Sequence, residues 1–394
     1  MSASATSRAI DAVWRIESAR LIAGLTRIVR DVGLAEDLAQ DALVAALAQW
    51  PQSGVPNNPG AWLMTTAKRR GIDALRRRVA LARKQEQIAH DLQILQQLDQ
   101  PDLAEDLDDV RDDVLRLIFM TCHPVLSREA RVALTLRLLG GLSTQEIARA
   151  FLVSEGTVAQ RIVRAKRTLS EARVPFEVPC RDELEQRLSA VLEVVYLIFN
   201  EGHTATAGEH WIRPSLCADA LRLGRILAAL MPNDAEVRGL LALMELQASR
   251  LRARVGPRGE PVLLGDQDRT RWDHLLVHRG LQALRRAEEL NDGALGPYTL
   301  QAAIAACHAS ARSIDQTDWL RIVALYDALA ALTGSPVVEL NRAVAVTMAF
   351  GPATGLELVD SLANEPALRS YHLLRSVRGD FLVRLGRMPE ARDE

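Results

Sequence analysis

The segment LSTQEIARAFLVSEGTVAQRIVRAKRTL, residues 142–169, constrains the fold of this chain most strongly, because it carries two helix N-caps close together. Ser143 is followed three residues later by Glu146, which is the spacing of a capping box. Ser154 stands eleven residues after Ser143 and can cap another helix. The spacing therefore predicts a helix, a tight turn and a second helix.

The second of these helices has two unlike faces. Its apolar positions repeat at helical spacing and form a stripe that we expect to be buried, namely Val158, Ile162, Ala165 and Leu169. Its polar positions point away from that stripe, namely Thr157, Gln160, Arg161, Arg164 and Arg167. A DNA-recognition helix seated on its partner helix has this layout. The alternative is an ordinary helical hairpin with exposed arginines.

A second basic helix is predicted at AWLMTTAKRRGIDALRRR, residues 61–78, which holds six cations in a chain of formal net charge -2. One face is apolar and is expected in the core, namely Leu63, Met64, Ala67, Gly71, Ala74 and Leu75. The opposite face carries Trp62, Arg69, Asp73, Arg76 and Arg77, with Arg70 at its edge. An aromatic ring among cations favours binding to single-stranded or melting DNA. The alternative is a solvated helix whose tryptophan tucks under the preceding loop.

Composition supports an all-α chain, because alanine and leucine abound, aromatic residues make up 4% and alternating strand patterns are scarce. Residues 1–180 hold 24 lysines and arginines against 22 acids, so any nucleic acid must be bound by local patches. The four cysteines lie far apart, which argues against a disulfide framework and fits a reducing cytosol. With no long apolar run, we expect a cytoplasmic protein that is neither exported nor membrane-spanning.

The chain divides into four predicted segments: a helical bundle at 1–80, an acidic linker at 81–107, the helix-turn-helix domain at 108–175, and paired helices at 181–394. In the last segment, GPATGLEL at Gly351 and GRMPEARD at Gly386 lie 35 residues apart. This offset is close to the period of about 34 residues of tetratricopeptide (TPR) hairpins. The pattern predicts a TPR-like helical repeat, and a plain antiparallel helical domain is the alternative.

A bundle that ends in a Trp-bearing basic helix and precedes a helix-turn-helix resembles the extracytoplasmic-function (ECF) sigma factors. DVGLAEDLAQDALVAALAQW and NPGAWLMTTAKRRGIDALRRR resemble the sigma-2 domain, and ARVALTLRLLGGLSTQEIARAFLVSEGTVAQRIVRAKRTL resembles sigma-4. The match covers about residues 10–173, with no room for a sigma-3 domain. It implies a bacterial subunit that directs core RNA polymerase to promoters and helps melt DNA, with no enzymatic activity and no cofactor.

The resemblance also implies roles for single residues. Asn57, Asn58 and Trp62 match the region that captures a flipped base of the -10 element, and Arg69, Arg70, Asp73, Arg76 and Arg77 match the segment that touches the -10 strand. Thr157, Gln160, Arg161 and Arg164 match the helix that reads the -35 element, and Arg167 continues that face. Asp37, Gln40 and Asp41 match the helix that docks on the clamp of core polymerase, although two acids one turn apart can also be merely solvated.

The C-terminal part resembles the TPR-like extension of one ECF subgroup, notably in VVYLIFNEGHTA, DQDRTRWD and GPYTLQAAIAA. An extension of this kind is expected to modulate activity, within the chain or through a protein partner. The chain stops at Glu394, inside what should be the second helix of a last hairpin, so we expect an incomplete or uncapped end. The acidic linker is expected to follow the RNA-exit path of polymerase, unless it is a solvated spacer.

Two other functions remain open from the sequence. A conventional helix-turn-helix regulator with a TPR-like sensor domain explains residues 142–394 but leaves Trp62 and its basic face unused. An enzyme seated in the C-terminal part would need the group Glu201, His203, Glu209 and His210, whose spacing is not that of a helical zinc motif.

Overall fold

The computed structural model describes residues 3–81, 107–151, 153–204, 212–257, 259–363, 365–368 and 371–394. The described residues form helices and connecting turns, with one isolated bridge between Val255 and Pro261 and no strand. The all-α prediction is therefore confirmed. The chain divides into two compact units, Met1–Leu223 and Gly224–Glu394, each of which is described by itself.

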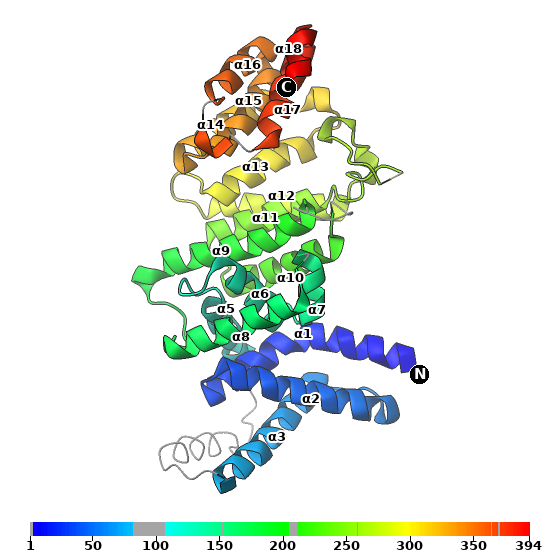
Figure 1. Cartoon of the computed structure of the whole chain (residues 1–394), viewed down its shortest axis with the longest axis vertical. Helices are drawn as coiled ribbons and strands as arrows, with labels where there is room; N and C mark the ends of the chain where they lie inside the picture. Colours follow the sequence, from blue (N-terminus) through cyan, green and yellow to red (C-terminus); the bar gives the residue numbers. More distant parts are fainter. Residues whose placement is uncertain are drawn as a thin grey trace. The chain divides into compact units, whose positions relative to one another are not determined.

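Three helices begin the first unit: α1 (Ala3–Val29), α2 (Val32–Ser53) and α3 (Pro59–Leu81). Helices α1 and α2 lie side by side, and α3 packs against both (Figure 1). The side chain of Asp31 caps α2 by accepting a hydrogen bond from the Leu34 amide at 2.8 Å. Apolar spacing gives each helix one buried face, so that Leu25, Trp50 and Leu63 are almost fully buried in a shared core.

The remaining helices of the first unit are α5 (Leu107–Thr121), α6 (Arg128–Leu138), α7 (Thr144–Phe151), α8 (Glu155–Glu171), α9 (Arg181–His203) and the first part of α10 (Pro214–Leu230). Helix α9 packs against α5 and α6, because its apolar face, including Val191, Val195 and Phe199, is buried. The beginning of the predicted C-terminal segment thus belongs to the same compact unit as the helix-turn-helix. The four-segment division itself stays a prediction.

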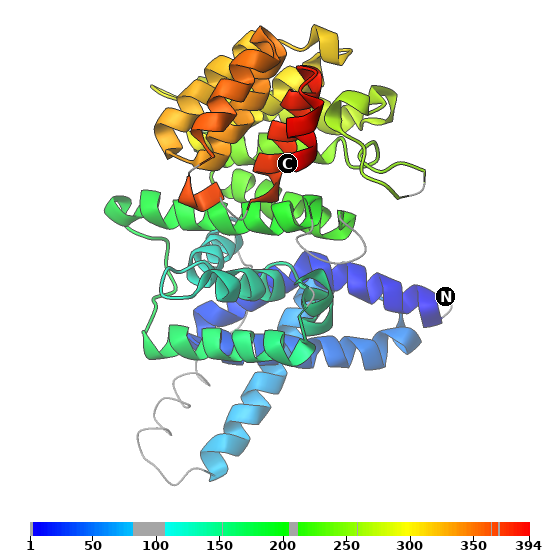
Figure 2. The same ribbon diagram turned by 45° about the horizontal axis from the view of Figure 1, so that its top comes forward.

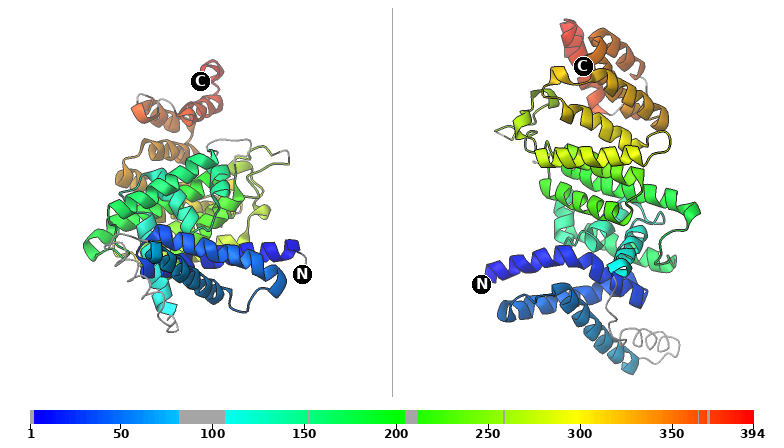
Figure 3. Two further views of the ribbon diagram at one scale, coloured as in Figure 1. Left: turned by 60° about the horizontal axis from the view of Figure 1, so that its bottom comes forward. Right: turned by 180° about the vertical axis from the view of Figure 1, so that it is seen from behind.

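The second unit continues α10 and adds the helices α11 (Ala235–Ala248), α12 (His274–Glu289), α13 (Pro297–Ser310), α14 (Trp319–Thr333), α15 (Pro336–Phe350), α16 (Pro352–Ser361), α17 (His372–Arg384) and α18 (Met388–Asp393). Short 3-10 turns lie between them at Leu264–Asp266, Arg269–Arg271, Ile314–Gln316 and Pro366–Leu368. Helix α13 packs mainly on α11, whereas from α14 onward each helix packs mainly on its neighbours in the chain, as in a stack of hairpins (Figures 2 and 3).

Close packing of α11 on α13 has two local causes. A side chain on Gly239 would place a carbon 2.3 Å from the Thr299 hydroxyl oxygen, so only glycine permits this approach. The Glu236 carboxylate accepts hydrogen bonds from the amides of Tyr298 at 2.8 Å and Thr299 at 3.0 Å. A side chain of α11 therefore satisfies the free amides at the start of α13.

Several predicted features fall outside the described residues, namely 82–106 of the acidic linker and Glu209 with His210 of the suspected cluster. For residues 73–80 the backbone is helical but the side chains are not described. Within the described ranges, each helix is too short or too polar to cross a bilayer.

Candidate nucleic-acid interface

Both predicted N-caps of the helix-turn-helix are present. The Ser143 hydroxyl oxygen accepts a hydrogen bond from the Glu146 amide at 3.1 Å, and the Glu146 carboxylate accepts one from the Ser143 amide at 2.8 Å. This reciprocal pair is the capping box expected from the sequence. The Ser154 hydroxyl oxygen accepts a hydrogen bond from the Thr157 amide at 3.1 Å and so caps α8. The prediction of helix, tight turn and helix is confirmed.

The apolar back of α8 is also confirmed. Its buried residues are Val158, Ile162, Ala165 and Leu169, and the helix packs against α6 and α7. On the other side, Gln160, Arg164 and Arg167 are exposed, whereas Thr157 and Arg161 are partly buried. Arg167 forms a surface ion pair with Glu171 at 2.6 Å. The structure therefore offers a largely polar face, interrupted by the exposed Val163, on a helix whose back is anchored in the unit.

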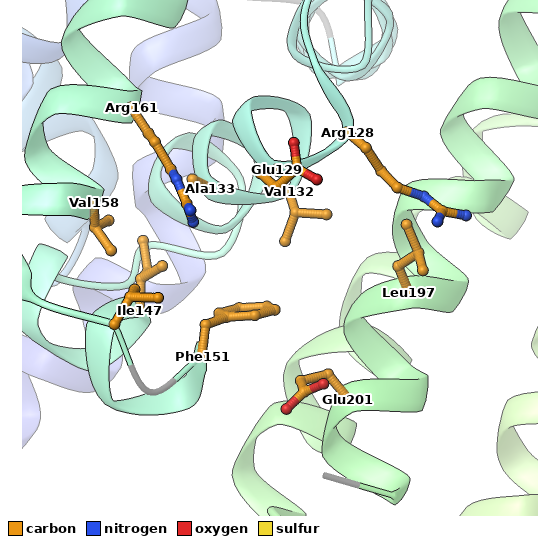
Figure 4. Close-up of a pocket in the computed structure, with 11 residues that line it drawn as sticks. Arg128, Glu129, Val132, Ala133, Ile147, Phe151, Val158, Arg161, Leu197 and Glu201 are labelled. Atoms are coloured by element: carbon orange, nitrogen blue, oxygen red, sulfur yellow. The ribbon is translucent and has the colours of Figure 1, made fainter. Parts of the chain in front are cut away.

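Arg161 lies apart from the more exposed residues of this face. It lines a cavity of about 170 Å³ between α6, α7, α8 and α9. Figure 4 shows its guanidinium extending over Ala133, with Phe151 of α7 opposite and Leu197 of α9 on the far wall. The first helix after the helix-turn-helix thus lies near one edge of the face that is expected to read DNA.

Three arginines that sequence reasoning missed attach α9 and α10 to the helices before them. Arg187 donates to the Phe119 carbonyl at 3.0 Å, and Arg222 donates to the carbonyls of Leu139 at 3.3 Å and Gly140 at 2.7 Å. These carbonyls lie at helix ends, where the backbone lacks partners within the helix. No local pattern marks these arginines, because their backbone acceptors are 63 to 83 residues away.

The third of these arginines joins α7 to α9. Arg213 donates to the carbonyl of Ala150 in α7 and forms an ion pair at 2.5 Å with Glu201 in α9. Both side chains of the pair are largely buried. The position of the helix-turn-helix is therefore tied to the beginning of the C-terminal segment.

The predicted apolar face of α3 is confirmed as far as side chains are described, since Leu63, Met64, Ala67 and Gly71 are buried. Asn58 begins the helix by accepting a hydrogen bond from the Ala61 amide at 3.1 Å. The side chain of Arg69 is exposed and that of Arg70 is partly buried, while Asn57 and Asn58 are exposed. Asp73, Arg76 and Arg77 lie on the same helix, and their side chains are not described.

Trp62 is partly buried and packs against Trp50 at the end of α2. The ring centroids are 5.2 Å apart and the rings meet edge to face at 65°. Trp50 itself is only 2% exposed. The Trp62 ring is thus held in a defined position at the corner between α2 and α3 and keeps part of its surface in solvent. It is neither fully exposed on the basic face nor fully tucked away, which were the two alternatives left open by the sequence.

A buried carboxylate on α2 links the N-terminal helices of the first unit to the helix-turn-helix. The side chain of Glu36 is 4% exposed and forms ion pairs with Arg137 of α6 at 2.6 Å and with Lys166 of α8. Gln40 donates a hydrogen bond to the same carboxylate at 2.5 Å. Sequence reasoning missed Glu36, because an acid in an amphipathic helix is normally solvated.

The neighbouring residues expected to contact polymerase remain accessible. Asp37 and Asp41 are exposed, and Gln40 is partly buried. Partial burial raises the pKa of Asp37, against the opposite effect of nearby Lys166. The exposed apolar side chains of Val44 and Leu47 follow on the same side of α2 at helical spacing. Together these residues form a mixed acidic and apolar stripe.

Comparison with known proteins finds three families that match parts of the chain. Residues 16–80 match the sigma-70 region 2 family, residues 116–169 match sigma-70 region 4, and residues 187–288 match a family described as of unknown function, DUF6596. No solved structure matches the chain.

Two relatives cover different shares of the chain. Uncharacterized protein R00370 of Rhizobium meliloti (strain 1021) is 43% identical over 372 residues, which is 93% of this chain and 86% of the relative. Probable ECF RNA polymerase sigma factor SigI of Mycobacterium tuberculosis (strain CDC 1551 / Oshkosh) is 28% identical over 172 residues, which is 43% of this chain and 57% of that protein. With sigma-70 regions 2 and 4 in this order, followed by a helical extension, the chain belongs to the ECF type of RNA polymerase sigma factors.

Proposed function

We propose that this sigma factor directs core RNA polymerase to promoters by reading the -35 element with α8 and the -10 element with α3, and that it assists melting. The assignment of the -35 element to α8 rests on the two unlike faces of that helix. Its apolar back is buried, while Gln160 and Arg164 are exposed near the middle of the helix. Such side chains can reach base edges and phosphates when the helix enters the major groove.

Support for the -10 assignment comes from the corner between α2 and α3. Asn57 and Asn58 are exposed there, and the ring of Trp62 is held against Trp50. A ring with a fixed position can stack on an unpaired base with little loss of side-chain freedom. Arg69 adds an exposed cation seven residues, or about two helical turns, further along α3 than Trp62. The roles of Asp73, Arg76 and Arg77 follow from the resemblance alone.

The stripe on α2 supports docking to core polymerase. Asp37 and Asp41 supply negative charge, and the adjacent Val44 and Leu47 are 57% and 46% exposed. Exposed apolar residues beside charged ones are typical of protein interfaces. A conventional DNA-binding regulator would not need this surface, so co-purification with core polymerase distinguishes the two functions.

Modulation by the C-terminal helices is the last part of the proposal. Arg213 and Arg222 tie backbone carbonyls of α7 and of the turn before it to the loop and helix that follow α9. A change in those later segments can therefore shift the helix-turn-helix without contact with DNA. Deleting everything after residue 180 is a poor test, because the deletion also removes α9 from the core of the first unit.

The central experiment is transcription in vitro with core polymerase on promoters identified by start-site mapping. The double variant Gln160→Ala/Arg164→Ala should lose initiation at promoters with a -35 element but still co-purify with core polymerase. Arg181→Ala, which removes an exposed arginine outside α8, is the matched control and should behave as wild type. Unchanged initiation by the double variant would contradict the assignment of α8.

Melting is tested separately with Trp62→Ala. If the ring stabilises an unpaired base, the variant should initiate poorly on duplex promoter DNA and almost normally on a template with a premelted -10 region. An equal defect on both templates would show that the tryptophan acts in folding or docking instead.

A further inference from the structure

The second unit contains a cavity of about 310 Å³ where the 3-10 turn Arg269–Arg271, the start of α12 and the end of α13 meet. Arg269, Trp272, His274 and Arg312 are among the residues that line it, and the lining includes no aspartate or glutamate. The cavity lies in the DQDRTRWD segment, a conspicuously charged motif for which promoter recognition has no use.

Positive charge is concentrated around Trp272. The guanidinium carbon of Arg269 lies 5.0 Å from the centre of the indole ring, and that of Arg250 lies 5.8 Å from it. Burial, together with the neighbouring charges of Arg254 and Arg269, lowers the pKa of Arg250 to about 10. Cations so close together repel one another unless an anion lies between or beside them.

Two of the three acids of the same motif are engaged elsewhere. The Asp268 carboxylate accepts hydrogen bonds from the amide and hydroxyl of Thr270, at 3.0 and 2.7 Å. The Asp273 carboxylate accepts from the amides of Leu275 and Leu276 at the start of α12, at 3.0 and 3.1 Å. Asp268 and Asp273 therefore serve as caps, and neither forms an ion pair with Arg250 or Arg269 in the described part of the chain.

Several N–H groups in the wall of the cavity have no hydrogen-bond acceptor among the described residues. Nη1 of Arg269 donates to the carbonyls of His308 at 2.5 Å and Ala311 at 2.6 Å, while its other nitrogens have no acceptor among the described residues. Trp272 is only 5% exposed, and its indole Nε1 has no hydrogen-bond partner there. Arg312 is exposed and has no carboxylate partner within the described ranges. A buried donor without an acceptor is unfavourable and uncommon.

We propose that this cavity is a binding site for a small anion, held by Arg269 and Arg312 and accepting a hydrogen bond from the indole N–H of Trp272. The ligand class is a compact molecule with a phosphate or carboxylate group, because such a group matches the planar donors of arginine. The cavity volume accommodates a small metabolite and excludes a folded partner. Binding at this site would let a small molecule act on the C-terminal helices independently of promoter recognition.

The test follows the indole N–H resonances of the full chain, labelled with ¹⁵N-tryptophan, during titration with inorganic phosphate and, separately, with citrate. The sequence contains six tryptophans, and Trp272→Phe assigns the signal of interest by its disappearance. We expect a saturable shift of that signal with at least one of the two anions. Arg312→Gln, at an exposed position, should weaken binding about tenfold, as expected for loss of one charge-assisted hydrogen bond.

The controls separate specific binding from general salt effects. Arg285→Gln removes another exposed arginine of the second unit and should leave the affinity unchanged. Response to phosphate alone identifies a phosphate site, and response to citrate alone identifies a carboxylate site. The proposal is overturned if neither anion shifts the Trp272 signal, if sodium chloride at the same ionic strength shifts it equally, or if Arg312→Gln binds as tightly as wild type.

Discussion

Replacing Glu36 by glutamine is expected to destabilise the first unit strongly. The carboxylate is 4% exposed, whereas the side chains of its partners Arg137 and Lys166 are 20% and 19% exposed. Glutamine preserves the size of the side chain but leaves two largely buried cations without their counter-charge. Removing one member of a buried ion pair typically lowers the free energy of unfolding by about 3–5 kcal/mol. Since both cations keep some contact with water, we expect about 3 kcal/mol, the lower end of that range.

The expected change in melting temperature is large enough to measure by calorimetry. For a unit of this size, 1 kcal/mol corresponds to about 2–4 °C, so Glu36→Gln should lower the transition of the first unit by about 6–12 °C. Calorimetry is preferable to a single optical probe because the two units can unfold separately. The transition of the second unit serves as an internal reference.

A matched control tests whether burial is the cause. Glu193 also bridges two arginines, Arg128 at 2.6 Å and Arg131 at 3.6 Å, but its side chain is 37% exposed. Glu193→Gln should therefore lower the free energy of unfolding by less than about 1 kcal/mol. Equal effects of the two substitutions would refute the reasoning. So would strict additivity of Glu36→Gln with Lys166→Gln, because residues that form one ion pair should show coupling.

Further predictions concern the helix caps, the exposed face of α8 and the second unit. Ser154→Ala should lower the free energy of unfolding of the first unit by about 1 kcal/mol, measured by urea unfolding, because the amide of Thr157 loses its acceptor. Arg164→Ala should weaken binding of the sigma factor–polymerase complex to a -35 duplex by about 1–3 kcal/mol, measured by fluorescence anisotropy, and an unchanged affinity would contradict its role. Burial, with the charges of Arg250 and Arg269, lowers the pKa of His308 from 6.5 to about 4. Between these values the unfolded chain binds a proton that the folded chain does not, so the stability of the second unit should fall by up to about 3 kcal/mol as the pH drops from above 6.5 to below 4. His308→Gln should flatten that dependence in calorimetric scans, and an unchanged slope would show that other groups cause it.

Features that depend on residues close in sequence were predictable. The capping box of Ser143 and Glu146, the Ser154 cap and the buried stripe of α8 all involve positions within one or two helical turns. Helical spacing and the hydrogen-bonding needs of free amides are sufficient to determine them.

Trp62 shows where local periodicity stops being informative. Its angular position on α3 follows from helical geometry, but its contact with Trp50 depends on the path of the intervening loop. That path is determined by loop conformation and core packing together, and no residue spacing within α3 encodes it.

The helices, their ends, and the polar and apolar faces of α3 and α8 follow from the amino-acid sequence, because they arise from interactions between neighbours along the chain. Which polar groups are buried together depends on the packing of the helices. Glu36 meets Arg137 across 101 residues, and Arg222 reaches Gly140 across 82. Such pairs form because packing of the helices removes water from both partners at once, and the identity of a partner then depends on the whole fold.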